Sequence, residues 1–442
     1  MTEPLDPRTA GRRYVTACVL YWFPVGLAVS PLILLFTERG MSLATVAAFF
    51  VAHSVTAAVL ELPTGGLSDV LGRRAVLAAA GLLNLAAFVL QGLGTAAWVL
   101  ALGMALMGAG RALSSGPAEA WYVDTVQAHS GPDAELRTGL ARGGTAVSAA
   151  LAAGTLLGGA LPWLLAQGGS AAGLSRVTSG LVLPLSAPPL LGAVVVTGFV
   201  VYVLSALPEP PRPPSTLRSV LHGIPATIAE GVRLGGRDPL IRRVLLSAAA
   251  AGGALAALEL LTPGRAASFT GAPESGAMLF AVLACAGFLC SGLGNHLAPL
   301  TARLAGSGER AVLAGLGAAA SGLFLLGATA VAAGPLALGL AVLGYGLVYL
   351  GLGAAGPSQN DLLHRRVPSA GRATALSVQS LALQLTGALT GLLVGVLPSG
   401  PLPWLTGGAM LLAGALLWIR RGAPEAESAQ PTPHGTGGVE RV

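Results

Sequence analysis

Four ionisable side chains lie in or beside long apolar stretches of the sequence: Glu61, Arg111, Glu119 and Glu259. A charged side chain at the centre of a bilayer costs about 3 kcal/mol or more, so such residues normally line a polar pathway or form buried pairs. A carboxylate whose surroundings alternate between wet and dry changes its pKa and can therefore carry a proton. We expect Glu61 and Glu119 to be the candidates for proton coupling, with Arg111 as the cation that holds one of them ionised, and Glu259 to be a candidate for the transport path.

A structural explanation competes with this one at each position. Glu61 and Glu119 could cap helices or pair with loop arginines at a membrane surface, and Glu259 could lie at the level of the outer headgroups. His53 is better explained as a hydrogen-bonded packing residue than as a proton carrier. The residue types alone leave these alternatives open.

The elements that position these residues are membrane-spanning helices. Hydrophobic residues make up 53% of the 442 residues and charged residues 10%, and the mean hydropathy is +0.73. Soluble domains carry about a quarter charged residues, so the composition indicates a polytopic protein embedded in a lipid bilayer. The net charge of +6 does not indicate a nucleic-acid partner, because in a membrane protein the distribution of arginine matters more than its sum.

Runs of about 20 apolar residues, the length that a helix needs to cross a bilayer, occur throughout the chain. They fall at about residues 15–37, 43–63, 75–94, 97–120, 140–165, 184–207, 242–262, 276–297, 311–333, 335–356, 374–397 and 402–419. With the N-terminus in the cytoplasm, the loops on that side hold nearly all arginines, as the positive-inside rule requires. Only Arg39, Arg176 and Arg265 fall on the outer side. We therefore expect a multi-pass protein with both termini in the cytoplasm.

A proline-rich segment divides the chain into two halves of similar size. It begins at Leu207 and contains Pro208, Pro210 and Pro211, which interrupt any helix. The predicted organisation is a cytoplasmic N-terminus at 1–13, a first six-helix bundle at 14–207, a linker with an amphipathic helix at 208–241, a second six-helix bundle at 242–420 and a disordered cytoplasmic tail at 421–442.

Short motifs recur in the same order in both halves. Arg74-Ala75-Val76-Leu77 is echoed by Arg310-Ala311-Val312-Leu313, and Gly116-Pro117 is echoed by Gly356-Pro357. Internal repeats are typical of secondary transporters, whose binding site lies where the repeats meet. We therefore predict an all-α integral membrane protein with 12 transmembrane helices in two six-helix bundles related by pseudo-twofold symmetry.

The segment between the second and third apolar runs carries the most specific motif, G-x-L-x-D-x-x-G-R-R. Its residues are Gly65, Asp69, Gly72, Arg73 and Arg74. It resembles the loop between helices 2 and 3 of the major facilitator superfamily, where charge contacts on the cytoplasmic side hold one conformational state. The resemblance implies a gating role for these residues. Val70 departs from the pattern, because the family usually has arginine after the aspartate.

The same resemblance implies a transport path, because helices 1, 4, 7 and 10 line the central cavity in that family. The path candidates on these helices, beside the ionisable residues above, are Tyr21, Trp22, Tyr345 and Tyr349. Tyr345 and Tyr349 are four residues apart and so share one helix face.

Two further motifs favour export. Gly154-Thr155-Leu156-Leu157-Gly158-Gly159 in the fifth apolar run is similar to the G-P-x-x-G-G motif of drug:proton antiporters, with Thr155 in place of proline and Gly154, Gly158 and Gly159 matching. Generic packing of small residues explains this segment equally well. Glu61-Leu62-Pro63-Thr64-Gly65, with Glu119-Ala120 and the following Asp124, resembles a bacterial branch of antibiotic and multidrug exporters. Asp124 thus joins the path candidates.

These observations predict a secondary active transporter in the bacterial cytoplasmic membrane that exports small amphipathic molecules such as drugs or antibiotics in exchange for protons. An importer or facilitator of a nutrient or metabolite is the alternative, because no residue encodes direction. The resemblance implies a monomer and no cofactor beyond the proton. The scattered histidines and three cysteines have no metal-ligand spacing, and no nucleotide-binding G-x-x-x-x-G-K-S/T loop occurs, so an enzyme is not expected.

Overall fold

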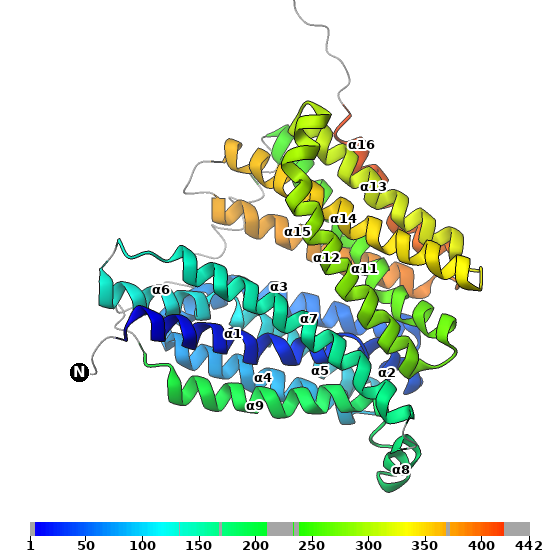
Figure 1. The fold of residues 1–442 in the computed structure, drawn as a ribbon, viewed down its shortest axis with the longest axis horizontal. Coiled ribbons are helices and arrows are strands. Elements are labelled where there is room, and N and C mark those ends of the chain that lie inside the picture. The colour runs from blue at the N-terminus through cyan, green and yellow to red at the C-terminus, as the bar shows by residue number, and fades with distance from the viewer. Residues whose placement is uncertain are drawn as a thin grey trace, which may run out of the picture.

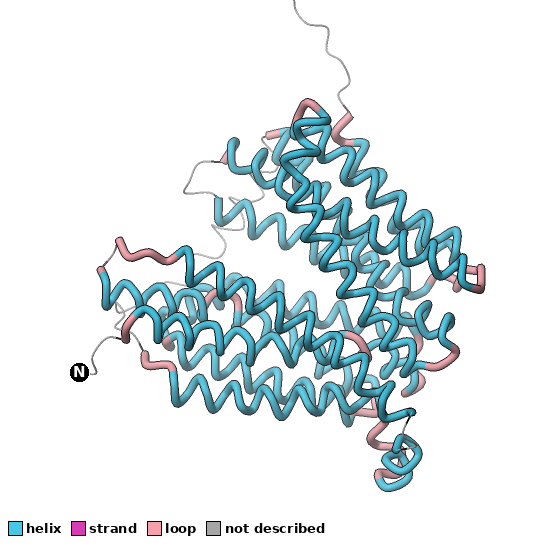
Figure 2. Tube along the Cα trace, viewed as in Figure 1, coloured by secondary structure: helices cyan, strands magenta, loops and turns pink. Residues whose placement is uncertain are grey.

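The computed structural model describes residues 5–131, 133–167, 170–209, 233, 238–367 and 372–419, and within these ranges it contains helices and loops but no strand (Figures 1 and 2). The helices of the first half are α1 Pro7–Val29, α2 Leu32–Glu38, α3 Leu43–Leu71, α4 Arg73–Leu93, α5 Ala97–Ser114, α6 Pro117–Ser130, α7 Arg137–Gln167, α8 Ser170–Val177 and α9 Ala187–Ala206. The helices of the second half are α11 Pro239–Thr270, α12 Pro273–Ala305, α13 Gly308–Thr329, α14 Pro335–Arg366, α15 Arg372–Val396 and α16 Pro401–Leu416.

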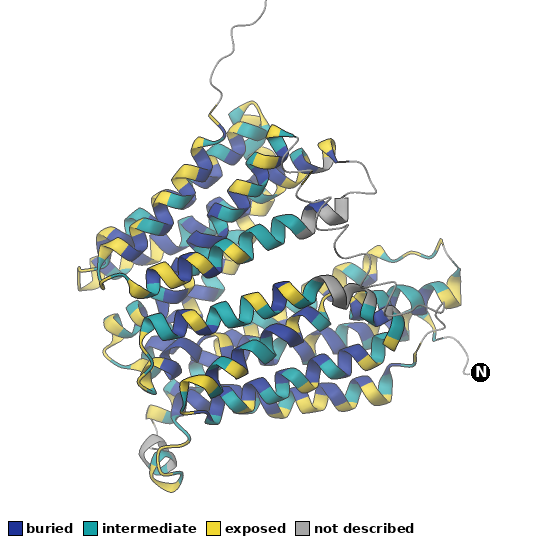
Figure 3. Ribbon diagram, turned by 180° about the vertical axis from the view of Figure 1, so that it is seen from behind, coloured by how far each residue is buried: buried dark blue, intermediate teal, exposed yellow. Residues whose placement is uncertain are grey.

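The described helices account for the predicted membrane crossings. Ten spans are long and apolar enough to cross a bilayer, and α1 with α2 forms an eleventh that is bent by 42°. The shorter apolar helix α16 supplies the last of twelve crossings. Exposed residues lie on the outer faces of the helices (Figure 3). Many of the exposed residues are large and apolar, as contact with lipid requires. The predicted all-α membrane fold is confirmed.

Two predicted spans are interrupted. The first breaks at Ser30 and Pro31, where α1 gives way to α2, and the Ser30 hydroxyl donates to the Thr155 carbonyl at 2.8 Å. The fourth breaks at Ser115 and Gly116, because Gly116 has a φ of 93° that ends α5 before Pro117 begins α6. The corresponding Pro357 of the second half lies inside the continuous helix α14, so the Gly-Pro echo does not produce the same break.

Both repeats begin with the same cap. Asp6 accepts hydrogen bonds from the backbone N–H groups of Arg8 and Thr9, and Pro7 occupies the first helical position. Asp238 caps α11 in the same way, followed by Pro239. This Asp-Pro pair is a strong helix-start signal, and it places the helix starts several residues before the predicted bundle boundaries at 14 and 242. The predicted amphipathic helix and the tail lie almost wholly outside the described residues.

The two halves meet at one end of the molecule and diverge toward the other, where α6 and the start of α1 lie (Figure 1). We name these the closed end and the open end. At the closed end a buried cluster joins the halves, with α2, α3 and α5 contributing from the first half and α11 and α15 from the second. Its members include Leu32, Val46, Leu100, Leu260 and Val394. The helix pairs α3–α15 and α7–α12 carry most of the contact between the halves.

Two arginines at the closed end bind the carboxyl ends of helices within their own half. Arg39 follows α2, and its guanidinium donates to the carbonyl of Gly92 near the end of α4, to the Leu181 carbonyl at 3.3 Å and to the Ser186 hydroxyl at 3.0 Å. Burial lowers the pKa of Arg39 from its usual value.

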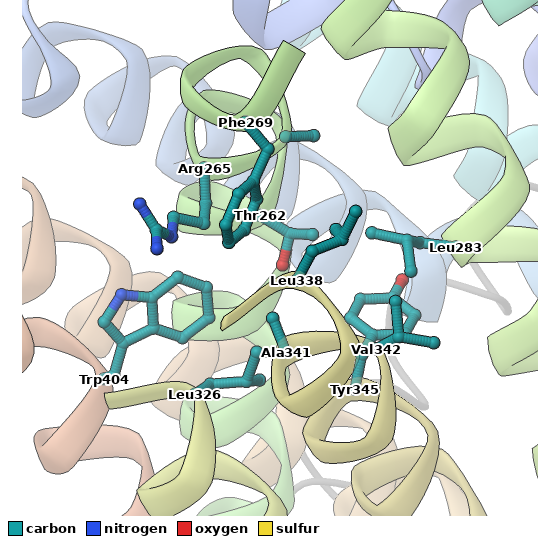
Figure 4. A pocket seen from close by; sticks show the side chains of 11 residues that line it. Thr262, Arg265, Phe269, Leu283, Leu326, Leu338, Ala341, Val342, Tyr345 and Trp404 are labelled. Carbon is teal, nitrogen blue, oxygen red and sulfur yellow. The ribbon is translucent and has the colours of Figure 1, made fainter. Parts of the chain in front are cut away.

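Arg265 does the same in the second half. Its guanidinium donates to the Thr329 carbonyl at 2.6 Å, at the end of α13, and to the Ala332 carbonyl. It also lies 4.0 Å from the centre of the Phe269 ring, beside Trp404 (Figure 4). A cation at a helix carboxyl terminus is favourable, so Arg39 and Arg265, which the positive-inside rule leaves on the outer side, have structural partners there.

Candidate functional site

A cavity of about 570 Å³ lies between the two halves. Its walls come mainly from α1, α3 and α5 of the first half and from α11, α12, α14 and α15 of the second, with smaller contributions from α2, α4 and α7. This volume is within the range of 300–1,000 Å³ that is typical of small-molecule sites. The cavity is therefore large enough for one drug-sized molecule.

Six of the predicted path residues line this cavity. They are Tyr21 and Trp22 on α1, Arg111 on α5, Glu259 on α11, and Tyr345 and Tyr349 on α14. They come from the first, fourth, seventh and tenth crossings, and they are brought together although up to 328 positions separate them in the chain. The structure thus places these six candidates from four spans at one site.

Aromatic contacts hold the three lining tyrosines in place. Tyr21 is buried, donates from its hydroxyl to the Gly110 carbonyl at 2.9 Å, and packs edge-on against Trp22 and Phe199. Tyr345 and Tyr349 pack against each other with ring centres 5.1 Å apart. Because Tyr21 is bound within the first half, Trp22 is the more available of the two aromatic side chains on α1.

Arg111 and Glu259 face the cavity from opposite halves. Both are exposed to it, and neither forms an ion pair or a side-chain hydrogen bond with a residue that the structure describes. Arg111 lies in the last turn of α5, where the helix dipole favours a cation. Water or a bound molecule must solvate both charges, since an unpaired charge is costly in an apolar enclosure.

The remaining acidic candidates lie outside the cavity lining. Glu61 on α3 accepts a hydrogen bond at 3.3 Å from Gln384 on α15, so this contact connects the two halves. Glu119 lies in the first turn of α6, a helix separate from the one that carries Arg111, and is exposed. Asp124, also on α6, forms an ion pair with Arg73 at 3.4 Å.

The G-x-L-x-D-x-x-G-R-R motif is helical for most of its length. The sequence predicted a polar loop here, but α3 continues through Gly65 and Asp69 to Leu71, and the break is limited to Gly72, which has a φ of 100°. A single residue with positive φ suffices to turn the chain into α4, because glycine adopts this conformation without steric cost. Arg73 binds the Ser68 hydroxyl as well as Asp124.

Glu209, at the start of the linker, lies against this motif. Its two carboxylate oxygens accept from the backbone N–H groups of Arg73 at 2.8 Å and Arg74 at 3.1 Å, and so cap the N-terminus of α4. The Arg74 guanidinium donates to the Leu204 carbonyl in the last turn of α9, and Trp121 donates to the Pro208 carbonyl at 2.8 Å. The motif therefore also fixes the point at which the chain leaves the first half.

The antiporter-like glycines lie at close helix contacts. A Cβ atom on Gly154 or Gly158 would lie 2.4 or 2.2 Å from backbone oxygens of α1. A Cβ atom on Gly159 would lie 2.5 Å from the Ala281 side chain of α12, in the other half. Close approach through small residues is the usual way in which membrane helices pack, and it accounts for these glycines without specifying a direction of transport.

Several lining residues escaped the sequence-based prediction. Most of them are apolar residues on α3, α5, α12 and α15, which include Phe50, Met104, Met107, Phe280 and Phe288. The polar ones are His53, Ser54, Asn84 and Gln384. Apolar cavity residues have no distinguishing signal in a membrane helix, because lipid-facing positions are apolar as well. Within the described residues no group of three or more His, Cys, Asp or Glu side chains is arranged to hold a metal ion.

The fold and the cavity define a helical membrane transporter with a central site between two halves. Residues 15–391 match the family model of the Major Facilitator Superfamily, and the chain belongs to this family. A search of curated proteins finds no match.

Solved transporter structures share the fold. The nucleoside transporter NupG is 12% identical with a TM-score of 0.70, and the match covers 92% of this chain and 98% of that one. A peptide transporter, POT, in complex with sulfate is 14% identical with a TM-score of 0.66, over 92% and 93% of the two chains. A bacterial homolog of the human lysosomal transporter Spinster, in an inward-facing and unoccupied conformation, is 17% identical with a TM-score of 0.67, over 95% of both chains. At these identities the similarity concerns the fold alone.

Proposed function

We propose that this chain is a proton-coupled exporter of small amphipathic molecules that works by alternating access. The observation that carries the proposal is the cavity between the halves, with aromatic walls and an ionisable residue contributed by each half. Apolar walls with a few convergent polar groups are typical of sites for amphipathic ligands. Rocking of the two halves about such a site is the usual mechanism of repeat-built transporters.

The positive-inside arrangement of arginines supports assigning the open end to the cytoplasm. The likeness to a structure described as inward-facing agrees with this assignment. A molecule from the cytoplasm or the inner leaflet would then enter at the open end, and the apolar cluster at the closed end would block its exit until the halves rock.

Glu61 is the carboxylate best placed for coupling. Its hydrogen bond to Gln384 joins the two halves, so rocking of the halves must alter its surroundings. Protonation converts a carboxylate that only accepts into a group that also donates, and therefore changes this contact. Glu119 is the second candidate, on α6 at the open end.

The test is proton movement in energised everted vesicles on addition of a panel of lipophilic cations and antibiotics. We expect a substrate-triggered proton flux that Glu61→Gln abolishes and Glu274→Gln, a control on α12, retains. A flux lost in Glu119→Gln but kept in Glu61→Gln would move the coupling site to α6. No flux with any compound, in vesicles that contain the inserted protein, would favour the importer or facilitator.

A further inference from the structure

The cavity holds two opposite charges that form no ion pair with any residue in the described part of the chain. Arg111 and Glu259 project into it from different halves, and neither has an ionic partner among the residues that the structure describes. The other ionisable lining residues are His53 on α3, which faces the cavity from the same half as Arg111, and three tyrosines. Arg111 therefore gives the cavity one basic pole in the first half, and Glu259 gives it one acidic pole in the second.

The surfaces between these poles are apolar and aromatic. Trp22 and Phe50 contribute from the first half, and Phe280, Phe288 and Tyr349 contribute from the second. Aromatic walls stabilise a flat ring system by burial and stacking. The Arg111 guanidinium and the Glu259 carboxylate are too far apart to form an ion pair with each other, so each can contact a different end of a bound molecule.

We propose that the cavity selects dipolar aromatic molecules, with an anionic group that pairs with Arg111 and an ammonium group that pairs with Glu259. This inference rests on the proposed function, because it names the substrate class of the same site. A lipophilic cation would neutralise Glu259 alone and leave the Arg111 charge unpaired in the enclosure, and an anion would leave Glu259 unpaired. A dipolar molecule satisfies both, so binding of one substrate brings charges from the two halves together.

The test uses norfloxacin, a fluorescent aromatic compound with a piperazine ammonium at one end and a carboxylate at the other. Its ethyl ester lacks the carboxylate and its N-acetyl derivative lacks the ammonium, with the ring system unchanged. Equilibrium binding of all three to the purified full-length chain in detergent is measured by fluorescence anisotropy at pH 7.4. We expect norfloxacin to bind at least about tenfold more tightly than either derivative, since each charge-assisted hydrogen bond of this kind contributes about this much.

Variants assign each end of the ligand to its partner. Arg111→Gln should abolish the preference of norfloxacin over its ester and keep the preference over the N-acetyl derivative, and Arg111→Lys should restore part of the first preference. Glu259→Gln should abolish the preference of norfloxacin over its N-acetyl derivative and keep the preference over the ester. The preference that each variant keeps shows that its cavity is folded. Arg142→Gln and Glu274→Gln, which remove charges that do not line the cavity, should leave both preferences unchanged.

Equal binding of the three compounds, absence of binding by all three, or loss of both preferences in either single variant would overturn the inference. Binding is measured without a membrane or a proton gradient, so its outcome is separate from that of the vesicle experiment. Charge-matched binding without proton flux would preserve this inference and refute coupled export. Proton flux driven by simple cations, with no preference for norfloxacin in the binding experiment, would support coupled export and refute this inference.

Discussion

At the scale of single residues, arginine side chains have three different roles in this protein. Arg111 faces a cavity and forms no ion pair with a residue that the structure describes, Arg73 pairs with Asp124 at the open end, and Arg39 and Arg265 bind helix carboxyl ends at the closed end. The guanidinium suits the last task because it presents several donors in a planar fork and remains charged when it is partly buried.

Arg39 and Arg265 should therefore contribute to stability and not to substrate choice. Each of the single substitutions Arg39→Gln and Arg265→Gln removes charged hydrogen bonds to backbone carbonyls, which we expect to cost about 2 kcal/mol and to lower the Tm in detergent. Binding at the cavity by molecules that remain folded should not change.

The matched control is Arg142→Gln, on the exposed surface of α7 near the open end. Its Tm should lie within the error of the unsubstituted protein. A Tm for Arg39→Gln or Arg265→Gln that equals this control would show that the carbonyl contacts contribute nothing measurable to stability.

At the scale of helices, small residues decide how closely the two halves approach. Gly159 on α7 packs against α12, and Gly395 on α15 packs against Ala44 and Ala47 at the start of α3. These contacts lie toward the closed end of the helices, so they stabilise the conformation in which this end is shut. Larger side chains would separate the halves where the apolar cluster now seals them.

We expect Gly159→Ala to weaken the closed end by about 1–3 kcal/mol, because its Cβ would lie 2.5 Å from the Ala281 side chain and 2.6 Å from the Ala277 carbonyl. Cys285 reports on this interface, since its Sγ lies 3.5 Å from the Ala152 carbonyl of α7. With Cys18 and Cys290 replaced by serine, maleimide should label Cys285 faster in the variant.

Gly144→Ala is the control on the same helix, because a Cβ atom there meets no neighbour within 4 Å. It should leave the labelling rate of Cys285 unchanged. Equal rates in Gly159→Ala and Gly144→Ala would mean that the α7–α12 contact does not hold the closed end shut.

At the scale of the whole molecule, the two halves form separate cores and meet at the closed-end cluster. The core of the first half includes Trp121 and Phe199 and that of the second includes Val348 and Trp418, while the closed-end cluster draws on both halves. Such an arrangement allows each half to move as a unit while the contact between them changes, which is what alternating access requires.

Rigid rocking predicts that distances across the open end shorten when substrate closes it. Spin labels at Thr138, at the start of α7, and at Leu304, at the end of α12, lie on exposed positions in different halves. In a cysteine-free background, pulsed electron spin resonance should show a shorter distance population after addition of substrate at acidic pH.

A pair within the first half, Thr138 with Ser205 at the end of α9, should keep its distance under the same conditions. A substrate-induced change in this second pair, with none in the first, would contradict rocking of intact halves.

The sequence by itself determined the membrane class, the twelve crossings, the repeat and the family, because each rests on a local property. Hydropathy marks a span within about twenty residues, since every backbone polar group in lipid must be satisfied inside its own helix. The family motif likewise lies within ten consecutive residues. Tyr21, Arg111, Glu259 and Tyr345 were accessible as candidates because polar or aromatic groups stand out against an apolar background.

Only the tertiary structure decided which candidates meet. Arg111 and Glu259 are 148 positions apart in the sequence, and both line one cavity without forming an ion pair with each other. Glu119 lies outside the cavity lining, and Asp124 forms an ion pair with Arg73. The tertiary structure also explained Arg39 and Arg265 by carbonyl groups that no motif marks. These outcomes depend on how helices from distant parts of the chain pack, and packing of small and apolar residues follows shape, which a one-dimensional pattern does not carry.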